Sequence, residues 1–306
     1  MSKALVTGGA GFIGSNLADA LIAAGYEVVV VDNLVTGKKE NINAAAKFYE
    51  MDILSEDLSK VFSAEKPDVV FHLAAQIDVR KSVEDPVWDG KQNILGSINL
   101  LENCKEFSVK KIIFSSTGGA IYGDTDQVPT TEDHSTKPIS PYGIAKLTIE
   151  HYLYYYQQIF GLPYVVLRYA NVYGPRQNSK GEAGVVAIFC DRLLSGQQAM
   201  IYGEGKQTRD YVFVGDVVAA NLAALKSDTI DTYNIGTSIE TDVNHLAELI
   251  KKNISSAPDF IHGPGKVGEQ RRSCLSYKKA QAKLGWQPQV KLEEGINKTV
   301  EWFKQK

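Results

Sequence analysis

Cysteine is scarce in this chain. Among its 306 residues only Cys104, Cys190 and Cys274 occur, and they are far apart in the sequence. A disulfide framework needs several paired cysteines, and a structural metal site needs ligands at short, regular spacing. We therefore expect neither disulfides nor a metal site, and the expected compartment is a reducing cytoplasm.

Long apolar runs and a dominant charge are also missing. No uninterrupted apolar stretch approaches the roughly 20 residues of a membrane-spanning helix. The first residues run directly into a strand-like pattern and lack the features of a secretory signal. Lys and Arg total 33 against 36 for Asp and Glu, a net charge of -3. We expect no membrane segment and no nucleic-acid partner.

Short apolar runs alternate with amphipathic helical patterns through the first half of the chain. The runs are continuous and mostly β-branched, which is typical of strands covered on both faces; they span residues 4–6, 28–31, 69–71, 112–114 and 164–167. The segments between them are long enough for crossover helices, as in 14–25 and 92–107. This rhythm predicts an α/β fold with a doubly wound parallel sheet of the Rossmann type.

The second half of the chain is less regular. Loop-like stretches rich in Gly, Pro and polar residues separate helical patterns, and two strand-like pieces, 211–214 and 232–235, fall among them. We expect a smaller α/β domain that is interleaved with the first. The predicted division assigns 1–168 and about 211–236 to a dinucleotide-binding domain, and about 169–210 and 237–306 to a substrate-binding domain.

A glycine-rich turn follows the first predicted strand and opens the first predicted helix. Gly8, Gly11 and Gly14 are three residues apart. Glycine allows a tight turn, close approach of the backbone to a pyrophosphate, and close packing of helix on strand. The amino terminus of the helix then presents free N–H groups to the phosphates. The strand before and the helix after make a dinucleotide site the better reading of this motif.

An acidic residue ends the second predicted strand. The carboxylate of Asp32 can accept hydrogen bonds from both ribose hydroxyls and would repel a 2′-phosphate, so we predict NAD over NADP. Asp52, after the strand-like segment 48–51, is a candidate to bind the adenine amino group. An ordinary turn explains Asp52 nearly as well.

Tyr142 and Lys146 lie four residues apart, after a proline that suits the start of a helix. This spacing puts both side chains on one helix face. A tyrosine has a pKa of about 10 in water; a neighbouring ammonium and a positive nicotinamide ring are expected to lower it, which makes a general base. Ser115 to Thr117 end a strand at the edge where such folds bind ligands, and a hydroxyl there could relay the substrate proton.

These motifs, with His72 to Ala75 and the segment 167–175, resemble the extended short-chain dehydrogenase/reductase superfamily and, within it, the UDP-hexose 4-epimerases. The resemblance covers nearly the whole chain and implies interconversion of UDP-glucose and UDP-galactose through a 4-keto sugar. Tyr142 would remove the proton of the 4-hydroxyl while C4 gives a hydride to NAD. Thr117 aligns with the catalytic Ser/Thr of the family, and Lys146 would hold the nicotinamide ribose and tune Tyr142.

The resemblance also implies binding residues. Those expected around NAD are Gly8, Gly11, Phe12, Ile13, Gly14, Asp32, Asn33, Asp52, Ile53, Leu73, Ala74, Ala75, Asn93, Ser115, Tyr142, Lys146 and Tyr169. Those expected around the UDP-sugar are Thr117, Tyr142, Asn171, Val185, Tyr202, Arg209, Lys266 and Glu269. Lys266 departs from the arginine usual in relatives, which puts that diphosphate contact in doubt. Ser273 or Cys274 falls near the position that gates the sugar C2 substituent, and a small residue there predicts activity on UDP-N-acetylglucosamine as well.

Three other functions share this pattern. A nucleotide-sugar 4,6-dehydratase needs an acid–base pair after the catalytic threonine, and the sequence has Gly118 and Gly119 there. A UDP-glucuronate 4-epimerase or decarboxylase could use Arg176 to face a sugar carboxylate. A non-catalytic NAD or nucleotide-sugar sensor is the third. The resemblance further implies a homodimer formed by helices within 92–107 and 142–160, the second of which carries Tyr152, Tyr154, Tyr155 and Tyr156.

Overall fold

A computed structural model describes residues 2–180, 184–265 and 270–306. Its main feature is a seven-stranded sheet with the order β11-β6-β5-β4-β1-β2-β3, in which every pairing is parallel. The strands are β1 (Lys3–Thr7), β2 (Glu27–Asp32), β3 (Lys47–Glu50), β4 (Val69–His72), β5 (Lys111–Thr117), β6 (Tyr164–Tyr169) and β11 (Asp231–Ile235). The predicted doubly wound sheet is confirmed, and each apolar run of the first half is one of its strands.

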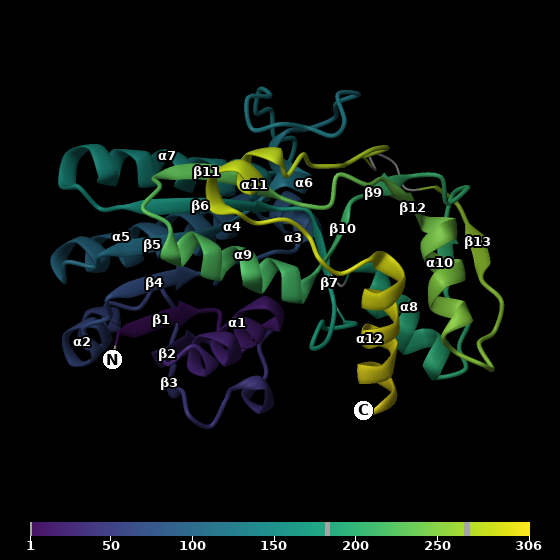
Figure 1. The fold of residues 1–306 in the computed structure, drawn as a ribbon, viewed down its shortest axis with the longest axis horizontal. Helices are drawn as coiled ribbons and strands as arrows, with labels where there is room; N and C mark the ends of the chain where they lie inside the picture. The colour runs from purple at the N-terminus through teal and green to yellow at the C-terminus, as the bar shows by residue number, and fades with distance from the viewer. Residues whose placement is uncertain (1, 181–183, 266–269) are drawn as a thin grey trace.

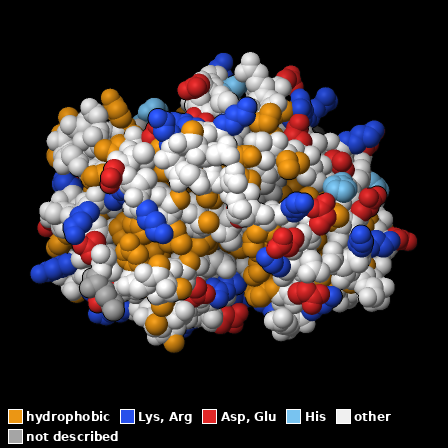
Figure 2. Space-filling model, viewed as in Figure 1, with side chains coloured by type: hydrophobic (Ala, Val, Ile, Leu, Met, Phe, Trp, Pro, Cys, Tyr) orange, Lys and Arg blue, Asp and Glu red, His pale blue; other side chains and the backbone are white. Residues whose placement is uncertain are grey.

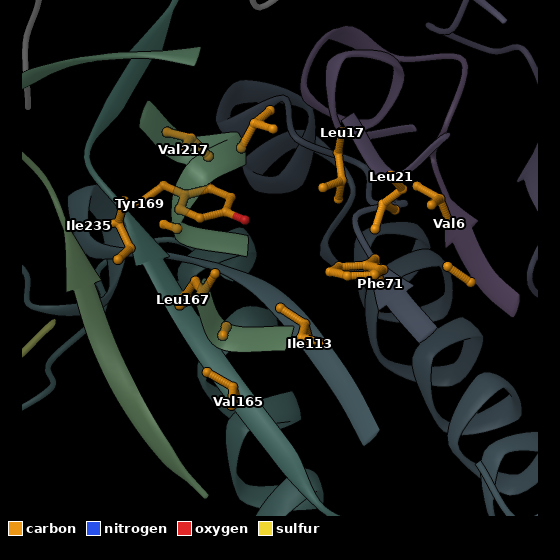
Figure 3. Packing of buried hydrophobic residues seen from close by; sticks show 14 of the residues in the cluster. Val6, Leu17, Leu21, Phe71, Ile113, Val165, Leu167, Tyr169, Val217 and Ile235 are labelled. Carbon is orange, nitrogen blue, oxygen red and sulfur yellow. The ribbon is translucent and has the colours of Figure 1, made fainter. Parts of the chain in front are cut away.

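Helices cover both faces of this sheet (Figure 1). One face carries α1 (Phe12–Ala23), α9 (Val214–Lys226) and α11 (Lys278–Leu284), and the other carries α2 (Leu58–Glu65), α5 (Gly96–Glu106) and α7 (Pro141–Phe160). Side chains of a strand alternate between the two cores because successive residues point to opposite faces. Val6 therefore packs with Leu17 and Leu21 of α1, whereas Leu5 packs in the other core. Figure 3 shows the first of these cores, where Leu167 and Tyr169 of β6 face Val217 of α9.

Helix α7 begins and ends where its sequence directs. The side chain of Ser140 accepts a hydrogen bond from the Gly143 N–H, Pro141 occupies the first turn, and Gly161 ends the helix in the left-handed conformation at φ 70°.

The region expected to form one helix over 92–107 contains several short elements. A π-helical turn, η2 (Lys91–Leu95), precedes α5, and two short helices, α3 (Val79–Glu84) and α4 (Pro86–Gly90), come before it.

The second half of the chain supplies a smaller lobe, drawn at the right of Figure 1. Its helices are α8 (Val185–Leu194), α10 (Val243–Lys252) and α12 (Leu292–Lys304), which share a third apolar core. Three two-stranded sheets accompany them: β7 (Asn171–Tyr173) with β10 (Tyr211–Phe213), β8 (Met200–Tyr202) with β13 (Ile261–Gly263), and β9 (Thr208–Arg209) with β12 (Thr241–Asp242). The short elements η1 (Lys39–Asn41) and α6 (Gly118–Ile121) lie in connections.

The strand-like segments 211–214 and 232–235 belong to different sheets. β11 returns to the edge of the large sheet beside β6, whereas β10 pairs with β7 outside it. Both had been expected in the dinucleotide-binding domain. The chain thus crosses between the lobes more than once.

Acidic and basic side chains are interspersed over the face shown in Figure 2, and none of the described helices combines the length and apolar character needed to span a bilayer.

Candidate active site

A cavity of about 690 Å³ opens where the strands of the large sheet end. Five carboxyl-terminal strand ends contribute to it: Gly8 follows β1, Asp32 ends β2, Leu73 follows β4, Thr117 ends β5 and Tyr169 ends β6. Loops after parallel strands meet at one edge of a sheet, so residues far apart in sequence converge there. The far side of the cavity is formed by the smaller lobe through Asn171 to Tyr173, Val185 and Val186.

The structure brings most of the predicted site residues to this one cavity. Those that line it are Gly8, Gly11, Phe12, Ile13, Gly14, Asp32, Asn33, Asp52, Ile53, Leu73, Ala74, Ala75, Ser115, Thr117, Tyr142, Lys146, Tyr169, Asn171 and Val185. The sequence-derived cofactor and catalytic residues thus share one space.

The glycine turn is shaped by close backbone contacts. Gly8 has a φ of +69°, and a side chain on it would place Cβ 2.8 Å from the Ala74 nitrogen. A Cβ on Gly14 would lie 2.2 Å from the Gly8 carbonyl oxygen. Helix α1 begins after Gly11 without a side-chain cap, so its first N–H groups remain available at the cavity wall. This open amino terminus fits a pyrophosphate.

Asp32 is held by two backbone N–H groups, one of them from the glycine turn. Its Oδ2 accepts from the Ala10 N–H at 2.9 Å and its Oδ1 from the Leu34 N–H at 2.8 Å. Each carboxylate oxygen has a further lone pair for a ribose hydroxyl. Asn33 donates from Nδ2 to Oδ2 of Asp52 at 2.9 Å, so these two predicted residues form one wall. The donor and acceptor pattern fits the adenosine half of NAD.

Lys146 lies between the sheet and Tyr142. Its Nζ donates to the Ser115 carbonyl oxygen at 2.9 Å and lies 6.0 Å from the centre of the Tyr142 ring. Thr117 lines the same cavity at the end of β5. Tyr142, Lys146 and Thr117, which the predicted mechanism requires, therefore lie in one cavity.

Burial changes the acidity of both α7 residues. Burial lowers the pKa of Lys146 to about 8, although the charges of Asp89 and Glu150 oppose this. Burial, and secondarily the charge of Asp89, raises the pKa of Tyr142 above its ordinary value. Without a bound cofactor, desolvation of the phenolate is the largest effect on Tyr142. The predicted lowering of this pKa by the Lys146 ammonium together with a positive nicotinamide ring stays a prediction.

Tyr169 reaches the cavity from β6. Its hydroxyl accepts a hydrogen bond from Nδ2 of Asn221 at 2.8 Å, and burial raises its pKa to about 12. Tyr169 is thus a neutral wall residue rather than a second base.

Some predicted residues lie away from the cavity wall. Asn93 is buried behind it and binds the main chain of Gln76 through Nδ2 and Oδ1, at 3.0 and 2.8 Å. It therefore supports a lining segment without lining the cavity. Tyr202 and Arg209 lie on the small strands β8 and β9, outside the described lining. Lys266 and Glu269 lie outside the described residues.

Ser273 and Cys274, expected near the sugar C2 group, do not line the cavity in the described part of the chain. Both are buried, and the Cys274 carbonyl accepts the Thr130 N–H at 2.8 Å. The next residue, Leu275, packs on the turn after Thr117, where a Cβ on Gly118 would lie 2.3 Å from Leu275 Cδ1.

Other lining residues escaped the sequence reasoning. They come from the segment after β4 and from the loop after β7, and include Gln76, Lys81, Trp88, Gln92, Gln177 and Lys180. The segment 76–92 looks like an ordinary polar turn in sequence. Only its proximity to the HLAA motif at 72–75 could have drawn attention to it.

Together, the fold and the cavity are those of a dinucleotide-binding enzyme, with a Tyr–Lys pair and a threonine in the cavity wall. A family model for the NAD dependent epimerase/dehydratase family matches residues 4–236. The chain belongs to that family.

Individual relatives are similar over the whole chain. A UDP-glucose 4-epimerase of Mycolicibacterium smegmatis is 44% identical over 310 residues, with 99% of each chain covered. The crystal structure of a Thermotoga maritima UDP-glucose 4-epimerase with UDP-glucose is 52% identical, with a TM-score of 0.97 and 99% of each chain covered. A Thermus thermophilus UDP-glucose 4-epimerase in complex with NAD is 44% identical, with a TM-score of 0.94 and the same coverage.

Proposed function

We propose that this protein interconverts UDP-glucose and UDP-galactose by inverting C4, with NAD as a retained cofactor. The observation that carries the proposal is the convergence of Tyr142, Lys146 and Thr117 on the cavity that also holds the glycine turn and Asp32. Two of the relatives described above support the substrate and the cofactor, because one is a UDP-glucose 4-epimerase solved with UDP-glucose and the other a UDP-glucose 4-epimerase solved with NAD.

Each of the three side chains has a role in this reaction. The phenolate of Tyr142 takes the proton from the sugar 4-hydroxyl and later returns it. The Thr117 hydroxyl hydrogen-bonds the same sugar oxygen and orients it. Lys146, fixed by the Ser115 carbonyl, would hold the nicotinamide ribose of bound NAD, and its ammonium would favour the phenolate. Bound NAD supplies reversible oxidation at C4.

Dehydration of the sugar is disfavoured by the residues after Thr117. A 4,6-dehydratase must move protons at C5 and C6, which requires acidic and basic side chains. Here Gly118 packs directly against Leu275, and Gly119 has no side chain. Epimerisation needs no such pair.

A glucuronate substrate is disfavoured by the state of Arg176. Its Nη2 forms a salt bridge of 2.7 Å with Asp19 on α1. One nitrogen of the guanidinium is thereby paired within the protein, whereas Nη1 is buried without a partner among the described residues and Arg176 lines the cavity. A neutral hexose does not compete with this salt bridge, and UDP-glucuronate and UDP-N-acetylglucosamine are the further substrates to test.

We further propose that the smaller lobe holds the UDP group, that the protein is cytoplasmic, and that two copies form a dimer. Its cysteines are free and buried, as a reducing compartment allows. On α7, Tyr154, Tyr155, Ile159 and Phe160 are exposed, and Leu95 of the adjacent η2 turn is exposed as well. Aromatic side chains of this kind are enriched at protein interfaces.

The test is incubation of the purified protein with UDP-glucose without added nicotinamide, followed by proton NMR. UDP-galactose is the expected product, and Tyr142→Phe is the matched inactive control. A 4-keto-6-deoxy sugar as product, or turnover of UDP-glucuronate alone, would contradict the proposal.

A further inference from the structure

Asp89 of α4 is a buried acid that the proposed reaction does not use. Its side chain is fully buried at 0% exposure. Oδ1 accepts from Nε2 of Gln76 and from Nδ2 of Asn93, both at 2.9 Å. Oδ2 is buried and has no hydrogen-bond partner among the described residues. An unpaired carboxylate oxygen in the interior is costly, and burial accordingly raises the pKa of Asp89.

A chain of hydrogen bonds fixes the position of this carboxylate. Asn93, in the π-helical turn, holds both Asp89 and the main chain of Gln76. Ser97 donates to the Asn93 carbonyl at 2.5 Å and bonds Nε2 of His72 at 2.8 Å. Burial lowers the pKa of His72 to about 3, so this ring is neutral. Asp89 is thus anchored to the end of β4 and cannot turn toward solvent.

The charge of Asp89 acts on Tyr142 and Lys146. Helix α4 packs against α7, which carries Tyr142 and Lys146. The charge of Asp89 raises the pKa of both groups, and Lys146 is the charged residue that acts on Asp89 in return.

Other charged groups around α4 are paired within the protein or exposed, although Asp78 and Lys81 also line the cavity. Glu150, which also acts on Lys146, is paired with Arg168. The remaining charged groups on the helices and turn packed against α4 are Asp78, Arg80, Lys81 and Glu84 of α3 and its cap and Lys91 of η2; Asp78 caps α3 and the other four are exposed.

We propose that Asp89 is a positioning residue that acts as the buried counter-ion of the Tyr142–Lys146 pair. Its charge keeps the Lys146 ammonium protonated in a dry site that must also accept a positive nicotinamide ring. An asparagine at this position can accept the same two hydrogen bonds through Oδ1, so a variant can remove the charge while keeping these contacts.

Asp89→Asn tests this directly, with Asp85→Asn as the matched control. Asp85 caps α4 by accepting the Trp88 N–H at 2.9 Å, is exposed, and is replaced by an equally good capping residue. Two quantities are measured on the NAD-saturated protein. One is the ionisation of Tyr142, which is measured as the difference in phenolate absorbance between each protein and the same protein carrying Tyr142→Phe. The other is the pH profile of UDP-glucose epimerisation, which rests on the proposed function.

Asp89→Asn is expected to move the Tyr142 titration and both limbs of the activity profile to lower pH by about 0.5 to 1 unit, because it removes a charge that favours the protonated forms. Asp85→Asn is expected to move neither. The melting temperature of Asp89→Asn at neutral pH should equal or exceed that of the parent. A group whose folded pKa is raised destabilises the fold when ionised, and this difference should vanish in acid.

Unmoved titrations overturn the inference. So does a loss of activity that is equal at every pH, or a large fall in melting temperature, because either would mean that Asp89 is structural. If the parent protein fails to turn over UDP-glucose, the proposed function fails, while the Tyr142 titration still decides the role of Asp89.

Discussion

Glu150 and Arg168 form a buried ion pair directly behind the reaction centre. Their side chains are each 8% exposed, and Arg168 donates to the Glu150 carboxylate from Nε at 3.0 Å and from Nη2 at 2.5 Å. Burial alone would lower the pKa of Arg168, but the hydrogen bonds and charge of Glu150 outweigh it and raise this pKa. Ser116, next to Thr117, also donates to Glu150 at 2.6 Å. The pair therefore joins α7 to both β5 and β6.

Removing one member should cost far more than the pair contributes. Glu150→Met leaves a buried guanidinium without its counter-ion, and Arg168→Met leaves a buried carboxylate. Each single change is expected to lower the free energy of unfolding by about 3–5 kcal/mol. The double replacement should cost far less than either single change, because it removes both charges together. The coupling energy is then more than about 3 kcal/mol.

The assay is urea unfolding of the four proteins, followed by tryptophan fluorescence. The exposed pair Glu294 and Lys298 of α12, at 2.6 Å, is the control, and its coupling should stay near 0.5 kcal/mol or less because water screens it. Single replacements of Glu150 and Arg168 that cost under about 1 kcal/mol, or costs that simply add, would refute the reasoning.

Three further predictions concern the cavity. Tyr142→Phe should reduce kcat about 10²- to 10⁴-fold with little change in retained NAD, measured by NMR and by absorbance of the released cofactor; an unchanged kcat would remove Tyr142 from its role. Because burial lowers the pKa of Lys146 to about 8, its ammonium is lost as the pH rises, and kcat/KM should fall with a midpoint at or below about pH 8. A flat profile to pH 10 would contradict this. Gly14→Ala places Cβ 2.2 Å from the Gly8 oxygen and should lower both melting temperature and NAD content, whereas Gly25→Ala, with no atom near its Cβ, should leave NAD content intact.

The fold of the large sheet could be read from the sequence because its signals are local. Runs such as 28–31 and 164–167 have no polar face and can only be buried on both sides. Strand partners are less local. β10 is more apolar than β11, yet β11 joins the large sheet and β10 pairs with β7, which at three residues is too short to predict from periodicity. The π-turn before α5 also leaves no pattern in the sequence.

Most of the predicted site residues were expected to converge on one cavity, and do, because much of their spacing is local in the sequence. Tyr142 and Lys146 are neighbours on a helix, and the glycine turn is continuous in sequence. The role of Asn93 was harder, since it depends on a turn that points its amide at Gln76. Asp89 was missed because it follows a run of exposed residues, 83–88, and α4 is buried at this position where it packs on α7.

The central claim is that one sugar is oxidised and reduced at C4 by a cofactor that never leaves. The most direct test is turnover of a mixture of two substrates. One is UDP-glucose deuterated at C4, and the other has hydrogen at C4 and a heavy isotope in the uridine. The account predicts UDP-galactose in which deuterium stays at C4 of the same molecules that brought it in. Deuterium that is lost to solvent, or scrambled between the two uridine labels, would contradict it.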